Sequence, residues 1–137
     1  MIDTLNIGQV IYNALSSNDD ITGYVGANIF PVVATFRSDA EFNSLMPFIV
    51  YQREGMTGRS TKDGVYEDSA QVSIKIVTSN YIQGVELATL VRKLFEDRKI
   101  QYENITMCDT QLQNAYEEYN DNYSAYVQTI KLNTKIS

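Results

Sequence analysis

Side chains suited to catalysis are scarce in this sequence. It has no histidine and a single cysteine, Cys108, so the usual general base at neutral pH and nearly every zinc-site pattern are missing. Ser73 is a candidate nucleophile, and its only nearby base is Lys75, which follows on the same face of a strand. Serine and lysine are ordinary neighbours on a solvated strand face. We therefore predict that the pair is not catalytic and that the protein is not an enzyme.

The remaining polar groups are poorly spaced for chemistry. Glu117 and Glu118 are adjacent, so they point to opposite faces of a strand or diverge by roughly 100° on a helix, and neither geometry directs both to one glycosidic oxygen. Residues 120–122 (Asn-Asp-Asn) lack the spaced acids, glycine and distant glutamate of a calcium loop. Cys108 is expected to be a small buried hydrophobe, because no lysine is close in sequence. We predict no metal and no cofactor.

The tyrosines carry more information. The chain has 10 tyrosines and no tryptophan, and tyrosine offers the rigid amphipathic surface that protein interfaces use. Most should pack at sheet edges and core margins, but Tyr116, Tyr119 and Tyr123 recur in the acidic segment 115–123, which we expect to be a turn. No basic residue lies between Lys99 and Lys131. This part of the surface is therefore predicted to be anionic.

Length and composition indicate one soluble globular domain spanning residues 1–137. Apolar residues make up 44% and charged residues 20% of the 137 positions, close to the globular average. The formal net charge of -6 disfavours nonspecific binding to nucleic acid or anionic lipid. The first residues lack the basic region of a secretory signal, and the uncharged run 21–36 is too short and interrupted for a membrane helix of ~20 residues. The chain is therefore expected to stay in a cytoplasm.

Hydrophobic periodicity predicts the order of elements. Apolar residues at helical spacing indicate a helix over residues 5–15, and Asp20 is expected to cap a short turn that Gly26 ends. An extended piece at 29–33 and a strand at 46–54 follow. An arm without apolar period, at about residues 54–67, is expected to be mobile and to join this strand to the strictly alternating strand 70–78.

The second half of the chain contributes one helix and two strands. A helix over residues 80–98 is expected to pack Leu87, Val91, Leu94 and Phe95 on the strand 70–78. Strands near 103–112 and 124–133 should flank the acidic turn. The order lacks regular βαβ alternation, so the predicted fold is α+β, with an antiparallel sheet of about four to five strands, an N-terminal helix and a long helix packed on the sheet.

These segments also follow one another in a recognisable order. They are the N-terminal helix, residues 28–31 (Asn-Ile-Phe-Pro) after a glycine-ended turn, 46–52 (Met-Pro-Phe-Ile-Val-Tyr-Gln), the polar arm, 70–77 (Ala-Gln-Val-Ser-Ile-Lys-Ile-Val), the helix opened by 79–81 (Ser-Asn-Tyr), and an alternating closing strand. In this order the chain resembles the small tail-completion proteins of long-tailed bacteriophages, the tail terminator or head-to-tail joining family. The resemblance covers nearly the whole chain.

The resemblance implies a structural role in a virion. Members of that family form rings, typically hexamers, at the head-proximal end of the tail tube, where they end tube polymerisation and join the tail to the head connector. The implied partners are other copies of the chain, the tail tube protein and the connector or stopper protein, with DNA passing through the lumen without specific binding. Such a protein is assembled in the bacterial host cytoplasm and resides in the virion.

Two segments are the expected interface. An arm with glycines and no apolar period has little reason to fold alone and can order on a partner, while tyrosines in the acidic turn can anchor one. The predicted interface residues are Arg53, Arg59, Lys62, Asp63 and Tyr66 in the arm, and Tyr116, Glu117, Glu118 and Tyr119 in the turn. Two alternatives stay open: a head-completion or connector stopper protein, and a non-viral α+β domain that binds a small molecule in one large apolar pocket.

Overall fold

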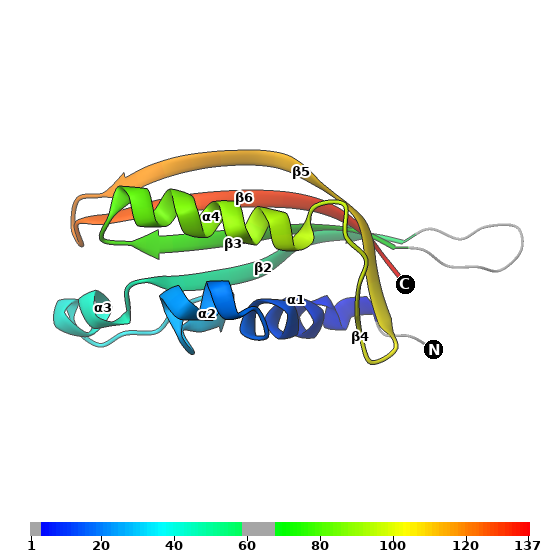
Figure 1. Ribbon diagram of the computed structural model, residues 1–137, viewed down its shortest axis with the longest axis horizontal. Helices are drawn as coiled ribbons and strands as arrows, with labels where there is room; N and C mark the ends of the chain where they lie inside the picture. Colours follow the sequence, from blue (N-terminus) through cyan, green and yellow to red (C-terminus); the bar gives the residue numbers. More distant parts are fainter. Residues whose placement is uncertain (1–3, 59–67) are drawn as a thin grey trace, which may run out of the picture.

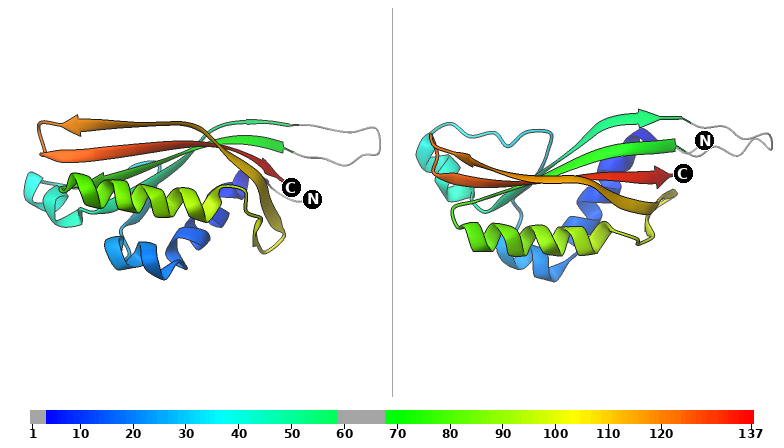
Figure 2. Two further views of the ribbon diagram at one scale, coloured as in Figure 1. Left: turned by 45° about the horizontal axis from the view of Figure 1, so that its top comes forward. Right: turned by 90° about the horizontal axis from the view of Figure 1, so that it is seen from above.

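One mixed sheet organises the part of the chain that the computed structural model describes, residues 4–58 and 68–137. Its six strands lie in the order β1-β2-β3-β6-β5-β4. The strands are β1 (Ile29–Pro31), β2 (Phe48–Thr57), β3 (Asp68–Thr78), β4 (Ile100–Tyr102), β5 (Ile105–Asn120) and β6 (Ala125–Ile136). The helices are α1 (Ile7–Ser16), α2 (Asp19–Val25), α3 (Asp39–Leu45) and α4 (Tyr81–Phe95), with a 3-10 turn at Thr4–Asn6. Helices α1, α2 and α4 lie on one side of the sheet (Figures 1 and 2).

The α+β class is confirmed, but the predicted sheet is wrong in two respects. It has six strands instead of four to five, and β1 runs parallel to β2, whereas the other pairs are antiparallel. Residues 32–47, which include α3, connect β1 to β2, and this is long enough for the crossover that parallel strands need. Strands β1 and β4 have three residues each, too few to show an alternating pattern.

The N-terminal helices bury the predicted stripe. The buried residues of α1 are Ile7, Val10, Ile11, Ala14 and Leu15. The predicted cap of α2 is wrong, because the side chain of Asn18, and not Asp20, accepts the backbone N–H of Ile21 at 3.1 Å. Asp20 instead lies in the first turn, where its charge favours the helix dipole. Gly26 ends α2 with a φ of 59°, as expected for a residue in the left-handed region.

The hairpin of β2 and β3 reaches into the predicted arm. Strand β2 ends at Thr57 instead of the expected residue 54, because residues beyond a bulge at Arg53/Gly55 still pair with β3. A bulge admits one extra residue and increases strand twist, so the pairing continues where the apolar alternation is lost. The predicted arm residues Arg59, Lys62, Asp63 and Tyr66 lie outside the described residues.

Helix α4 packs on the sheet largely as predicted. Leu87, Val91 and Phe95 are fully buried against the face that carries Ile74 and Ile76. Leu94, which we expected to share this contact, is only partly buried at the margin of the core. The side chain of Asn80 caps the helix by accepting the backbone N–H of Gln83 at 3.0 Å.

The expected acidic turn is for the most part a strand. Residues 115–120 belong to β5 and pair with residues 125–130 of β6, so the true turn is confined to 121–124. Tyrosine favours strands, and the pairing with β6 decides the conformation although both faces of β5 are exposed here. The strand at residues 115–120 was not predicted because its sequence lacks the apolar alternation of a half-buried strand.

A second, smaller core lies on the opposite face of the sheet. Helix α3, which the sequence did not predict, is capped by Ser38 and places Phe42 on Phe48 of β2 and on Tyr123. The ring centroids of Phe42 and Tyr123 lie 4.3 Å apart in a stacked arrangement. The aromatic packing anchors the turn between β5 and β6, and so it sets the position of the adjacent end of β5.

Candidate interaction surface

Strand β5 divides the four predicted turn residues between two faces. Glu117 and Tyr119 lie opposite Gln128 and Tyr126 of β6, on the side of the sheet covered by α4, whereas Tyr116 and Glu118 point to the other side. Glu117 and Glu118 thus diverge as the sequence predicted for a strand. The four residues therefore do not form one cluster, and their role in an interface stays a prediction.

Glu117 is held by two side chains. The hydroxyl of Tyr81 on α4 donates to Oε1 and Oε2 of Glu117 at 3.1 and 2.9 Å, and the amide of Gln128 donates to Oε2 at 2.9 Å. The hydrogen bond from Gln128, followed by that from Tyr81, lowers the pKa of Glu117 below its usual value. The same carboxylate raises the pKa of Tyr81, chiefly by the hydrogen bond and secondarily by its charge. Glu117 is therefore a fixed anion at neutral pH.

Aromatic rings surround this carboxylate. The rings of Tyr81 and Tyr119 each pack in a T-shaped arrangement with the ring of Tyr126, with centroid distances of 5.6 and 5.0 Å. Ile82, which follows Tyr81 in α4, and Val85, one turn farther along this helix, are 67% and 39% exposed. We call Tyr81, Ile82, Val85 and Tyr119 the α4–β5 surface. Fixed aromatic rings beside exposed aliphatic groups are typical of the residues that anchor protein interfaces.

The other face of β5 is polar. The ammonium group of Lys131 lies 5.8 Å from the centroid of the Tyr116 ring, and its Nζ is 3.4 Å from Oε2 of Glu54 at the β2 bulge. Lys131 on β6 therefore bridges β5 and β2 across this face. Because both charged groups are about one third exposed, the ion pair contributes little to stability.

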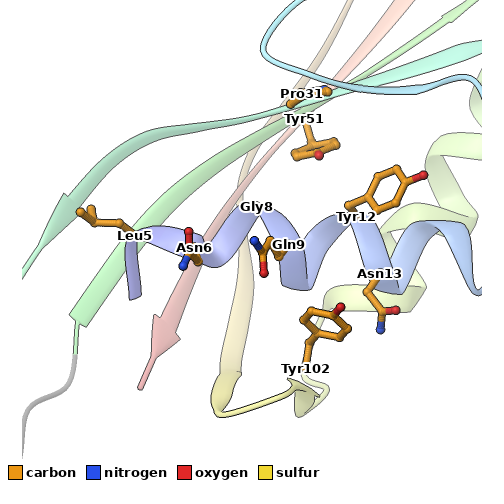
Figure 3. A pocket seen from close by; sticks show the side chains of 9 residues that line it. All are labelled: Leu5, Asn6, Gly8, Gln9, Tyr12, Asn13, Pro31, Tyr51 and Tyr102. Carbon is orange, nitrogen blue, oxygen red and sulfur yellow. The ribbon is translucent and has the colours of Figure 1, made fainter. Parts of the chain in front are cut away.

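A groove runs along α1 (Figure 3). Its volume is about 420 Å³. The lining residues are Leu5, Asn6, Gly8, Gln9, Tyr12, Asn13, Pro31, Tyr51 and Tyr102. Pro31 on β1 and Tyr102 on β4 come from the two ends of the strand order, so the sheet curls around α1.

The groove continues onto exposed apolar residues. Val32 donates its backbone N–H to the carbonyl of Tyr51, a lining residue, and Val32 and Val33 are each 63% exposed. Leu5 and Tyr12 are exposed at the groove itself. We call Leu5, Tyr12, Val32 and Val33 the α1–β1 surface. No charged side chain is among the residues that line the groove in the described part of the chain.

Arg53 is the one predicted arm residue within the described ranges. It lies on β2 at the bulge, and its Nη1 donates to the carbonyl oxygen of Leu5 at 2.9 Å. The guanidinium thus fastens the 3-10 turn before α1 to the sheet. Its predicted role in an interface stays a prediction.

The groups considered for catalysis differ in their burial. Ser73 is buried, whereas Lys75 is exposed, and Cys108 is a half-buried free thiol. In residues 120–122 the side chain of Asn120 accepts the backbone N–H of Asn122, which shapes the turn. Over residues 4–58 and 68–137 no group of three or more acids or cysteines is placed to hold a metal ion. Within the same ranges no helix has the length and apolar character needed to cross a membrane.

Comparison with known proteins relates the chain to others by fold. No family model matches the sequence, and no curated protein matches it. A chain from the virion of a native gene transfer agent particle has a similar structure, with a TM-score of 0.73 and 12% identity over 92% of this chain and 90% of that one. A second solved protein, whose name states no function, has a TM-score of 0.67 and 12% identity over 100% of this chain and 97% of its own. At such identities the likeness establishes a shared fold.

Proposed function

We propose that this chain is a structural virion protein of a phage or phage-like particle, and that it acts as a tail terminator. The observation that carries the proposal is the fold shared, over 92% of the chain, with a component of a gene transfer agent virion. The order of sequence segments, which resembles the tail-completion family, supports the same role. In this role the chain resides in the neck of the virion, and it binds by shape and needs no catalytic centre or cofactor.

The terminator role explains why such a protein requires different surfaces. A tube that grows by adding identical rings exposes the same face after each addition, so its end must be capped by a protein that matches that face and presents another. This chain offers an acidic aromatic end of β5 on one side and an uncharged groove along α1 on another. A ring of such subunits, typically a hexamer, would bind the tail tube protein and the head connector and let DNA pass through its lumen.

The test is deletion of the gene for this protein from the genome of the phage or phage-like particle. Tails of uncontrolled length, or tails without heads, are the expected result by electron microscopy. Tails of normal length that remain joined to heads would refute the functional proposal. Tails of normal length beside heads that have lost their DNA would assign the chain to the connector stopper instead. Subunit exchange of this protein with purified tails or with purified heads separates these two roles.

The two faces of β5 can be tested separately by complementation. Tyr119→Ala alters the side covered by α4, and Tyr116→Ala alters the opposite, polar side. If one face docks a partner, one variant should fail to restore head attachment while the other restores it. Asn43→Ala, at an exposed position of α3, is the control and should restore attachment fully.

A further inference from the structure

The exposed apolar side chains gather in two places. Within the described residues, every large apolar side chain that is exposed lies either beside α1 and β1 or beside α4 and the end of β5. The first group is Leu5, Tyr12, Val32 and Val33, and the second is Tyr81, Ile82, Val85 and Tyr119. Tyr116 is also exposed at the end of β5, but it points to the opposite face of the sheet. Scattered apolar residues are normal on a surface, but grouped ones mark a site of interaction. Figure 1 shows α4 and β5 along one side of the molecule and α1 along the other.

The α4–β5 surface borders an open strand edge. Strand β4 pairs with the outer edge of β5 only at residues 105–107. Beyond these residues, the carbonyl of Thr110 on β5 accepts the N–H of Asp97. Farther along β5, the side chain of Asn114 accepts the backbone N–H of Ala115. Between residues 116 and 120 no described segment pairs with the outer edge of β5. An open edge beside exposed apolar groups is a surface built for contact with another molecule.

Charge indicates what can cover this surface. A second α4–β5 surface is a poor partner, because it would bring Glu117 of two copies together, and like charges oppose pairing. The α1–β1 surface has no charged group in its groove and presents the amides of Asn6, Gln9 and Asn13. These amides can donate hydrogen bonds to carboxylates while the valines cover the aromatic rings.

The α1–β1 side is suited to contact through side chains. Pro31 has no backbone N–H, and Val32 has a φ of 65°, so the chain leaves the extended conformation after β1. Strand addition at this edge is therefore blocked, which is one of the ways that proteins protect a sheet edge. Its exposed valines remain available to pack against an apolar surface.

We infer that the α4–β5 surface of one copy packs on the α1–β1 surface of the next copy, in a head-to-tail contact. The two surfaces differ, so the contact is heterologous and every copy carries one free surface of each kind until a ring closes. This inference rests on the proposed ring-forming function and names the surfaces that join its subunits. The aromatic rings of Tyr81 and Tyr119 are the anchors of the contact, and Val32 and Val33 pack against them.

Two charge substitutions test the inference. Ile82→Asp disrupts the α4–β5 surface and Val33→Asp disrupts the α1–β1 surface; both positions are more than half exposed, so the fold should persist. The wild-type chain at ~100 µM should form oligomers in sedimentation and native mass spectrometry, since this concentration saturates any contact with a Kd of about 1 µM or tighter. Each variant alone should be monomeric. An equal mixture should form dimers of one chain of each kind, because only one intact pair of surfaces remains.

The controls separate this result from the alternatives. Asn43→Asp adds a negative charge on exposed α3, outside both surfaces, and should associate like the wild type. Thermal unfolding monitored by circular dichroism verifies that each variant is folded. Oligomers formed by Val33→Asp alone, a mixture that stays monomeric, or a monomeric wild-type chain would each overturn the inference.

This outcome is independent of the functional test. Abnormal tails after loss of the protein, combined with a monomeric mixture, would retain the terminator role and reject the contact. Normal tails combined with mixed dimers would reject the role and retain the contact.

Discussion

The hydroxyl of Tyr81 joins α4 to the carboxylate of Glu117 on β5, with distances of 3.1 and 2.9 Å to the two carboxylate oxygens. The contact links the first turn of the helix to the exposed end of the sheet. Because Gln128 donates to the same carboxylate, Glu117 is fixed from two elements. The acidic group of the candidate surface is therefore held in place before any partner arrives.

Replacing Tyr81 should change the titration of its acidic partner. In Tyr81→Phe the pKa of Glu117 should rise toward its ordinary value, because one of the two hydrogen bonds that lower this pKa is lost. NMR titration of the Glu117 side chain measures this pKa in the wild type and in the variant. Tyr24→Phe is the matched control, since Tyr24 donates to Glu86 at 2.8 Å elsewhere on the surface. It should leave Glu117 unaffected, and an unchanged pKa in Tyr81→Phe would contradict the prediction.

The same pair predicts a pH dependence of stability. The pKa of Glu117 is lower in the folded than in the unfolded chain, so its stabilising contribution is present above the unfolded pKa and is lost as pH falls through the folded pKa. The stability difference between wild type and Tyr81→Phe should therefore be largest near neutral pH and shrink in acid. Urea unfolding across this acidic range measures the difference. A difference that grows in acid would show that another group dominates.

Truncation in α4 should separate its buried and exposed faces. Leu87 is fully buried on the sheet, so Leu87→Ala should lower the free energy of unfolding by about 2 to 5 kcal/mol through a cavity. Ile82→Ala on the exposed face of the same helix should change it by less than about 0.5 kcal/mol. Urea denaturation gives both values. Equal effects would mean that the helix packs through a different face.

Two helical glycines should respond in opposite directions to alanine. A Cβ at Gly84 would lie 2.9 Å from Oγ1 of Thr78, whereas a Cβ at Gly23 would meet nothing within 4 Å. Alanine improves helix propensity by up to about 1 kcal/mol at either position. At Gly84, crowding of the buried Thr78 should cost about 1 to 3 kcal/mol and prevail. The midpoint temperature of thermal unfolding should therefore rise for Gly23→Ala and fall for Gly84→Ala. A rise for both variants would show that the side chain of Thr78 moves aside freely.

A buried hydroxyl pair should show energetic coupling. Oγ1 of Thr110 and Oγ1 of Thr134 are 2.8 Å apart, and both residues are fully or almost fully buried. Thr134→Val should cost about 1 to 3 kcal/mol, because the hydroxyl of Thr110 is left without this partner. The double variant with Thr110→Val should cost less than the sum of the two single variants. Additive costs in urea denaturation would indicate that the two hydroxyls do not interact.

The fold was predictable where one face of an element is buried. Ile7 to Leu15 in α1 and Leu87 to Phe95 in α4 follow the helical period, because these helices each pack one stripe on the sheet. Helix α3 was missed because its burial depends on a single residue, Phe42. The end of β5 was missed because exposed strands need no apolar alternation, and pairing with β6 determines their conformation.

The candidate surface was predictable only in part. Tyr116 and Tyr119 were identified from composition, but their separation onto two faces depends on the strand conformation of β5. Ile82 and Val85 were missed, although a signal was present, since both lie off the apolar stripe of a helix whose other exposed positions, apart from Tyr81, are polar. The link from Tyr81 of the same helix to Tyr119, through the ring of Tyr126, is tertiary information. The predicted role of the arm residues beyond Gly58 lies outside the described part of the chain.

The place of β6 between β3 and β5 has a consequence for biosynthesis. The strand that completes the middle of the sheet is the last of the six to be translated, and it pairs from end to end with β3, with Asp68 beside Ile136. A nascent chain on the ribosome therefore carries two incomplete half-sheets until translation has passed Ile136. Such distant pairings form slowly and leave strand edges open to aggregation in the meantime. Chaperones that shield an emerging polypeptide should thus raise the yield of this protein more than that of a helical protein of equal length.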